Sequence, residues 1–124
     1  MRALIVDDSS FIRDYIRQQM EYLGWICAEA QHGGEALGVV RQDDGFDVML
    51  VDVNMPVMDG MECVRQLREA QLAPEMKVMV VTTEADNSFI RQALEYGADE
   101  FLMKPFSPQS LREKLLLLGF EMAA

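Results

Sequence analysis

The stretch Val48-Met49-Leu50-Val51-Asp52 decides the fold class of this sequence. Its first four residues are apolar without alternation, and the run Val78–Val81 further along the chain has the same character. Strands covered by helices on both faces have this composition, because neither face meets water. Both runs are therefore predicted to be central strands of a parallel sheet.

On either side of these runs, short apolar segments alternate with longer segments of helical spacing. Three more strands are predicted at Ala3–Val6, Trp25–Ala28 and Phe101–Met103, and the mixed composition of the second suits an edge. The clearest helical stripe contains Phe11, Ile12, Tyr15, Ile16, Met20 and Leu23, with Arg13, Arg17 and Glu21 off it. Further helix starts are predicted at Asp59, with Glu62 three residues on, and at Ser107-Pro108. This alternation predicts an α/β fold, (βα)5, with a five-stranded parallel sheet and helices on both faces.

Length and charge narrow the classes of function. The 124 residues suit one domain spanning 1–124, and 11 basic against 21 acidic residues give a net charge of −10. An acidic surface repels phosphate backbones and anionic lipid, so nucleic acid and membrane are not expected partners. Cys27 and Cys63 form no metal-ligand pattern. No apolar run is long enough for a membrane span or a signal-peptide core, so a cytoplasmic protein is expected.

Four of the five predicted strands end in residues that can carry chemistry. Ligands of open parallel sheets bind outside the carboxyl ends of the strands, where the strand order reverses. The first strand ends in Asp7-Asp8, the third in Asp52, the fourth in Thr82 and the fifth in Lys104. The sheet should therefore gather three acids, a hydroxyl and an ammonium at one edge.

Three carboxylates about 4 Å apart would repel by roughly 4 kcal/mol per pair at a dielectric near 20. Either a proton or a cation has to relieve this repulsion. Oxygen ligands without histidine or cysteine select Mg²⁺, Ca²⁺ or Mn²⁺. A carboxylate beside such an ion and a lysine has the parts for phosphoryl transfer, in which the acid attacks phosphorus and becomes an acyl phosphate.

The same residues carry a family resemblance that covers essentially the whole chain. The matching segments are Ile5-Val6-Asp7-Asp8-Ser9, Val51-Asp52-Val53-Asn54-Met55-Pro56, Met58-Asp59-Gly60, Thr82-Thr83-Glu84-Ala85, Gly97-Ala98-Asp99 and Lys104-Pro105-Phe106. In these the sequence resembles the receiver domains of two-component response regulators, most of all the CheY-like chemotaxis group. The resemblance implies the flavodoxin-like strand order 2-1-3-4-5.

The resemblance also implies a role for each strand-end residue. Asp52 would accept a phosphoryl group from a sensor histidine kinase, and Lys104 would contact that group. Mg²⁺, with Mn²⁺ or Ca²⁺ as substitutes, would be held by Asp8, Asp52 and the backbone carbonyl of Asn54, and by Asp7 through water. The Lys104–Pro105 peptide would be cis.

A switch is implied as well, with Thr82 and Phe101 as its pair. The chemotaxis proteins commonly have tyrosine where Phe101 stands, and often tryptophan where Val53 stands. The lone Trp25 is predicted on the second strand, away from the site. The face formed by the fourth helix, fifth strand and fifth helix would bind an unknown output protein, since 124 residues leave no room for an output domain.

The four consecutive leucines Leu115–Leu118 leave two interpretations open. One is scattered exposed apolar groups, and the other is a partner or dimer surface on a monomer or weak dimer.

Two rival functions remain beside the switch, which would catalyse only its own phosphorylation and dephosphorylation. A magnesium-dependent aspartyl phosphatase needs a second acid two residues after the nucleophile, where this chain has Asn54. A receiver-like binding module that carries no phosphate is the other, and the intact set of acids, hydroxyl and lysine argues against it.

Overall fold

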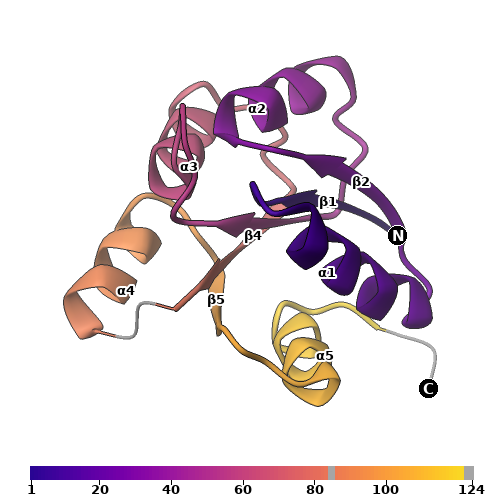
Figure 1. Cartoon of the computed structure of the whole chain (residues 1–124). Coiled ribbons are helices and arrows are strands. Elements are labelled where there is room, and N and C mark those ends of the chain that lie inside the picture. The colour runs from indigo at the N-terminus through magenta and orange to yellow at the C-terminus, as the bar shows by residue number, and fades with distance from the viewer. Residues whose placement is uncertain (84–85, 122–124) are drawn as a thin grey trace.

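The computed structural model describes residues 1–83 and 86–121 and shows five strands alternating with five helices (Figure 1). The elements are β1 (Arg2–Val6), α1 (Ser10–Tyr22), β2 (Ile26–Ala30), α2 (Gly33–Gln42), β3 (Val48–Asp52), α3 (Gly60–Glu69), β4 (Lys77–Thr82), α4 (Asn87–Glu95), β5 (Glu100–Met103) and α5 (Pro108–Leu117). All strand pairs are parallel, and the sheet has the order β2-β1-β3-β4-β5. The predicted fold class and strand order are both confirmed.

The sheet has a separate hydrophobic core on each face. Helices α2, α3 and α4 cover one face, and α1 and α5 cover the other (Figure 1). Along β1, Leu4 and Val6 pack into the first core, while Ala3 and Ile5 pack into the second. Strands β3 and β4 alternate between the two cores in the same way. Two covered faces therefore explain why the central strands are apolar at every position.

The predicted helix starts are confirmed. Asp59 caps α3 by accepting a hydrogen bond from the Glu62 amide at 2.9 Å. The Glu62 carboxylate does not return to the Asp59 amide, as it would in a capping box, but pairs with Arg65. Ser107 caps α5 by accepting from the Ser110 amide at 3.1 Å, and Pro108 occupies the first helical position. Among the described residues, no helix combines the length and the apolar composition needed to cross a bilayer.

The second strand begins one residue later than predicted. Trp25 precedes β2 and is 2% exposed, with its ring packed edge-on against Phe120 at 5.0 Å between centroids. The sequence signal is weak there because β2 is an edge strand in which only Ala30 is fully buried. Trp25 thus lies at the amino ends of the strands, opposite the edge where the acids gather.

The run of four leucines is divided between core and surface. Leu115 is buried in the core between α5 and the sheet, whereas Leu116 and Leu117 are 42% and 72% exposed. A single helical stripe cannot bury consecutive residues, so α5 carries apolar surface next to β5.

Candidate functional site

Three aspartates meet at the carboxyl edge of the sheet. Asp7 directly follows β1, Asp52 is the last residue of β3, and the pairing of Val6 with Val51 brings these strand ends abreast. One carboxylate oxygen from each of Asp7, Asp8 and Asp52 lies within 4.8 Å of the others. The structure thus brings together the three acids that the strand ends predicted.

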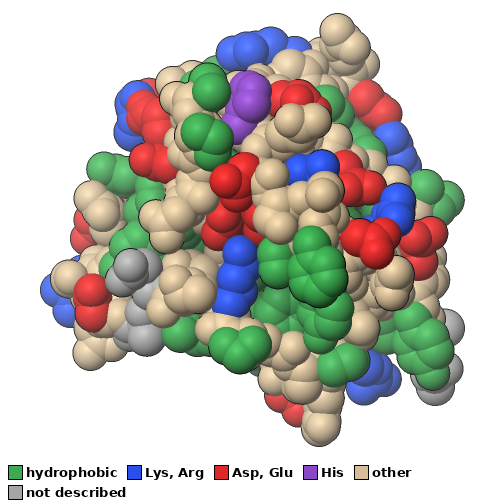
Figure 2. Space-filling model, in the orientation of Figure 1, with side chains coloured by type: hydrophobic (Ala, Val, Ile, Leu, Met, Phe, Trp, Pro, Cys, Tyr) green, Lys and Arg blue, Asp and Glu red, His purple; other side chains and the backbone are tan. Residues whose placement is uncertain are grey.

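Lys104 reaches this cluster from the end of β5. Its Nζ atom donates to Asp7 Oδ2 at 2.9 Å and to Asp52 Oδ1 at 3.1 Å. Its backbone amide donates to the Thr82 carbonyl at 2.8 Å, which ties the ends of β4 and β5 together. The Lys104–Pro105 peptide is cis, as the resemblance implied. In Figure 2, acidic and basic side chains adjoin at the middle of the face that is drawn, and a hydrophobic patch lies beside them.

Burial and close contact shift the pKa values of two groups in the site, Asp52 and Lys104. Asp7 and Asp52 are only 2% and 8% exposed, while Asp8 is exposed. Burial raises the pKa of Asp52, and the hydrogen bond from Lys104 partly opposes that rise. Burial lowers the pKa of Lys104, but its hydrogen bonds and attraction to Asp7 and Asp52 prevail and raise it.

The donor set fits a divalent cation. Three carboxylates face one ammonium, so the ionised cluster carries an uncompensated charge of −2. Oxygen donors of this kind suit Mg²⁺, which typically takes one or two carboxylates and keeps several waters. The contributions of Asn54, which is exposed in the β3–α3 loop, and of a water on Asp7 remain predictions.

The β3–α3 loop folds back tightly behind Asp52. The Gly60 amide donates to the Val53 carbonyl at 3.0 Å, so the first turn of α3 packs directly on the end of β3. A Cβ atom at Gly60 would lie 2.1 Å from the Asp52 carbonyl oxygen. Gly60 therefore helps to position Asp52. The motif Met58-Asp59-Gly60 signals the family, but its sequence alone does not reveal this close approach.

The two residues of the implied switch lie on one side of the sheet. Phe101 pairs with Val80, two residues before Thr82 on β4, and residues two apart on a strand share a face. Thr82 is 1% exposed, whereas Phe101 is half-buried and has the Lys114 Nζ atom 4.3 Å from its ring centroid. Glu84 and Ala85, which belong to the motif after β4, lie outside the described residues.

An apolar groove of about 400 Å³ borders the acidic cluster. It lies between the start of α1 and the β5–α5 loop and is lined by Phe11, Ile12, Tyr15, Thr83, Lys104, Pro105 and Phe106. Phe11 is 78% exposed, and the Tyr15 hydroxyl donates to the Phe106 carbonyl at 3.2 Å across the groove.

Comparison with known proteins identifies the family. Residues 3–116 match the family described as response regulator receiver domain. The chain belongs to the response regulator receiver family. Receiver domains are phosphorylation-based signalling switches rather than conventional enzymes, and they interact with histidine kinases and output proteins. The cluster of Asp7, Asp8 and Asp52 is typical of the Mg²⁺ site of these domains.

Several relatives of similar length are chemotaxis proteins. The receiver is 38% identical over 116 residues to a chemotaxis protein CheY homolog of Campylobacter jejuni, covering 93% of this chain and 89% of that one. It is 36% identical over 121 residues to chemotaxis protein CheY1 of Helicobacter pylori, covering 96% and 98%. The structure of Vibrio cholerae CheY4 superposes with a TM-score of 0.87 at 34% identity, covering 94% of this chain and 96% of that one. The CheY-like resemblance seen in the sequence is thus confirmed.

Proposed function

We propose that residues 1–124 form a single receiver domain that takes a phosphoryl group from a sensor histidine kinase onto Asp52 in a Mg²⁺-dependent reaction. The observation that carries this proposal is the contact of Lys104 with both Asp7 and Asp52 inside a cluster of three carboxylates. A lone ammonium cannot neutralise three acids, so the site is prepared for a divalent ion and an anionic group together.

Asp52 is the acid best suited to be the nucleophile. Both oxygens of Asp7 are engaged, since Oδ1 accepts from the Ser9 amide at 2.9 Å and Oδ2 from Lys104. Asp8 is exposed to water, whereas Asp52 sits at the end of a central strand beside Lys104. A carboxylate oxygen of Asp52 attacks phosphorus, the phosphorus–nitrogen bond to the donor histidine breaks, and the imidazole nitrogen leaves with its electron pair.

Each remaining residue of the site has a defined task. Asp8, Asp52 and the carbonyl of Asn54 would hold the Mg²⁺ ion, and Asp7 would hold it through water, with Mn²⁺ or Ca²⁺ as substitutes. When bound, the ion supplies charge neutralisation at the phosphoryl oxygens. Lys104 shares this charge from the side of β5, and Thr82 donates its hydroxyl to a phosphoryl oxygen.

The donor is a protein, and the apolar groove supports this. Phe11 is 78% exposed at the rim of the groove, and Lys104 belongs to both the groove and the acidic cluster. A protein that covers the groove therefore brings its side chains to the mouth of the site. Together with the family membership, this supports a domain that acts in the cytoplasm beside a histidine kinase.

The output of the switch is a changed surface on α4, β5 and α5. Thr82 follows the phosphoryl group, and Phe101 rearranges with it. The apolar residues Leu94 and Leu117 are 49% and 72% exposed on this surface and suit a protein partner or a weak dimer. Because several relatives of similar length are chemotaxis proteins, chemotaxis is the proposed pathway.

Incubation with Mg²⁺ and acetyl phosphate is expected to add one phosphate to the protein, measured as a gain in intact mass. The added group should be labile to alkali, because it is an acyl phosphate. The gain should vanish in Asp52→Asn and when a chelator removes the metal.

Three results of that experiment would contradict the proposal. Uptake that persists in Asp52→Asn would move the acceptor to another residue. Continuous release of phosphate from many monoesters would favour an aspartyl phosphatase, and no uptake at all would favour a binding module without phosphate.

Phosphorylation is also expected to move the ¹⁹F resonance of Phe101 in protein labelled with 4-fluorophenylalanine, assigned through Phe101→Leu. Phe46 is a matched control, since Arg2 lies 4.4 Å from its ring centroid much as Lys114 lies over Phe101. Phe46 precedes β3 and therefore lies at the opposite edge of the sheet, so its resonance should stay in place. An unchanged Phe101 resonance in a sample whose mass shows phosphate would remove Phe101 from the switch.

A further inference from the structure

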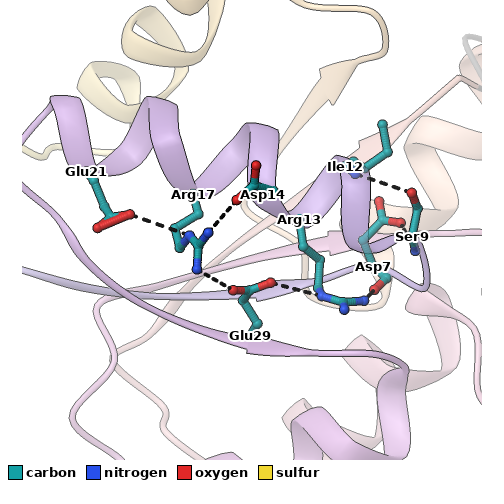
Figure 3. A network of polar contacts seen from close by, with 8 residues as sticks. All are labelled: Asp7, Ser9, Ile12, Arg13, Asp14, Arg17, Glu21 and Glu29. Carbon is teal, nitrogen blue, oxygen red and sulfur yellow. Dashed lines mark hydrogen bonds and ion pairs between the residues drawn. The ribbon is translucent and has the colours of Figure 1, made fainter.

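A polar network links β2 and α1 to the turn that carries Asp7 and Asp8 (Figure 3). The Arg13 guanidinium on α1 donates through Nη1 to the Asp7 carbonyl at 2.6 Å and through Nε to Glu29 Oε1 at 3.0 Å. The Arg13 side chain is only 12% exposed. One planar guanidinium thus connects a carboxylate on β2 to the backbone of the acidic turn.

The Asp7 carbonyl belongs to the peptide that joins Asp7 to Asp8. Fixing the plane of this peptide fixes one backbone dihedral of each residue, and with them the directions in which the two carboxylates leave the chain. Within residues 1–83 and 86–121, no hydrogen bond or ion pair holds the Asp8 carboxylate itself. The direction of the Asp8 side chain therefore depends on the backbone of this turn.

Other contacts hold the same turn on its remaining sides. The Asp7 amide donates to the Ala30 carbonyl at 3.1 Å, and the Asp7 carboxylate accepts from the Ser9 amide. Ser9 also caps α1 by accepting from the Ile12 amide at 3.2 Å. Among the charged groups in this set, Arg13 is the one that reaches the carbonyl between the two acids.

Arg13 acts through position more than through its charge. Glu29 lies against it and compensates that charge, and Glu29 is shared with Arg17 at 3.1 Å. Arg17 also pairs with Asp14 and with Glu21 on α1 (Figure 3). Arg13 and Arg17 thus share one helix and one partner, and of the two Arg13 contacts Asp7.

We propose that Arg13, held in place by Glu29, is a positioning residue that fixes the Asp7–Asp8 turn for divalent-ion binding. This inference rests on the proposed function, because it takes the acidic cluster to be the metal site. Arg13 and Glu29 would then belong to the site as groups that orient its carboxylates. Loss of such orienting groups typically weakens metal binding by about 10- to 100-fold.

The test is the affinity for Mg²⁺, measured by calorimetric titration without any phosphodonor. Arg13→Met is expected to weaken Mg²⁺ binding by about tenfold, because the carbonyl and its turn lose their anchor. Arg13→Lys keeps the charge but not the planar fork that serves two acceptors, so it should also weaken binding. Arg17→Met, the matched control, should bind Mg²⁺ within about twofold of the wild type, because Arg17 makes no contact with Asp7.

A second measurement separates positioning from a general structural role. The phosphorylation rate is followed against Mg²⁺ concentration with acetyl phosphate as donor. Arg13→Met should shift the half-saturating Mg²⁺ concentration and leave the rate at saturation close to that of the wild type. Where Arg13→Met fails to fold, Arg13→Lys and Glu29→Gln take its place.

The outcomes distinguish this inference from the function on which it rests. A wild-type protein that binds no Mg²⁺ would overturn the proposed function itself. A wild type that binds Mg²⁺ while the Arg13 variants bind equally well would overturn only the role of Arg13. Equal weakening in the Arg13 and Arg17 variants would show an effect of helix charge and would likewise overturn it.

Discussion

Gly60→Ala is expected to destabilise the protein by about 4 kcal/mol or more, within the range reached by severe backbone clashes and core disruption. The added Cβ atom would lie 2.1 Å from the Asp52 carbonyl oxygen and 2.9 Å from its carbon. Both atoms are backbone at the end of β3, so relief of the clash requires a shift of Asp52 or of α3. Urea unfolding followed by circular dichroism and by the fluorescence of the buried Trp25 measures the loss.

Gly38→Ala is the matched control for this substitution. Gly38 lies inside α2, and a Cβ atom there meets nothing within 4 Å. Alanine should therefore stabilise the protein by about 0.5–1 kcal/mol, because it reduces the backbone entropy lost when the helix forms. Gly60→Ala with wild-type stability would show that α3 does not press on Asp52 as closely as the structure indicates.

The clash at Gly60 also predicts a functional defect in whatever fraction of the variant folds. Asp52 must move together with its carbonyl, and a displacement of about 1 Å in a reacting group is enough to slow a reaction by about 100-fold. Phosphate uptake from acetyl phosphate at a temperature below the unfolding transition measures this defect separately from stability.

The central sheet and the acidic cluster could be predicted because both depend on short-range sequence signals. Burial on two faces produces the continuous apolar runs of β3 and β4, and the parallel topology then brings the residues that follow them to one edge. Asp7, Asp52 and Lys104 were placed correctly for this reason. The edge strand β2 lacks such a signal, and its start was misplaced by one residue at Trp25.

Other parts of the site depend on contacts that a sequence pattern does not show. Arg13 lies off the apolar stripe of α1, where a charged side chain ordinarily faces water, yet its side chain is largely buried against Asp7 and Glu29. Val57 in the β3–α3 loop has a φ of 69° while its side chain is 87% exposed. A β-branched residue avoids that left-handed region, so the path of the loop is set by the packing of α3 behind Asp52 and not by local preference.

Lys104→Met is expected to destabilise the metal-free protein by about 3 kcal/mol, because it leaves buried carboxylates without their cation. Asp7 and Asp52 are 2% and 8% exposed and would then face each other and Asp8 uncompensated. Urea unfolding in the presence of a chelator measures the loss. Lys114→Met is the matched control, since Lys114 pairs with Glu100 nearer the surface and its loss should cost less than about 1 kcal/mol.

Lys104→Met should change Mg²⁺ binding and phosphorylation in opposite directions. With all three carboxylates ionised, the variant cluster carries a charge of −3 where the wild type carries −2, and a nearby ammonium repels a divalent ion that binds the same carboxylates. Mg²⁺ should therefore bind the variant at least about tenfold more tightly and restore much of its stability.

Phosphate uptake by Lys104→Met at saturating Mg²⁺ should nevertheless fall by about 100-fold, because the phosphoryl oxygens lose the ammonium that faces them. Tighter metal binding together with slower phosphorylation would assign Lys104 to the phosphoryl group and not to the metal, whereas weaker metal binding by the variant would contradict the charge balance on which the site depends.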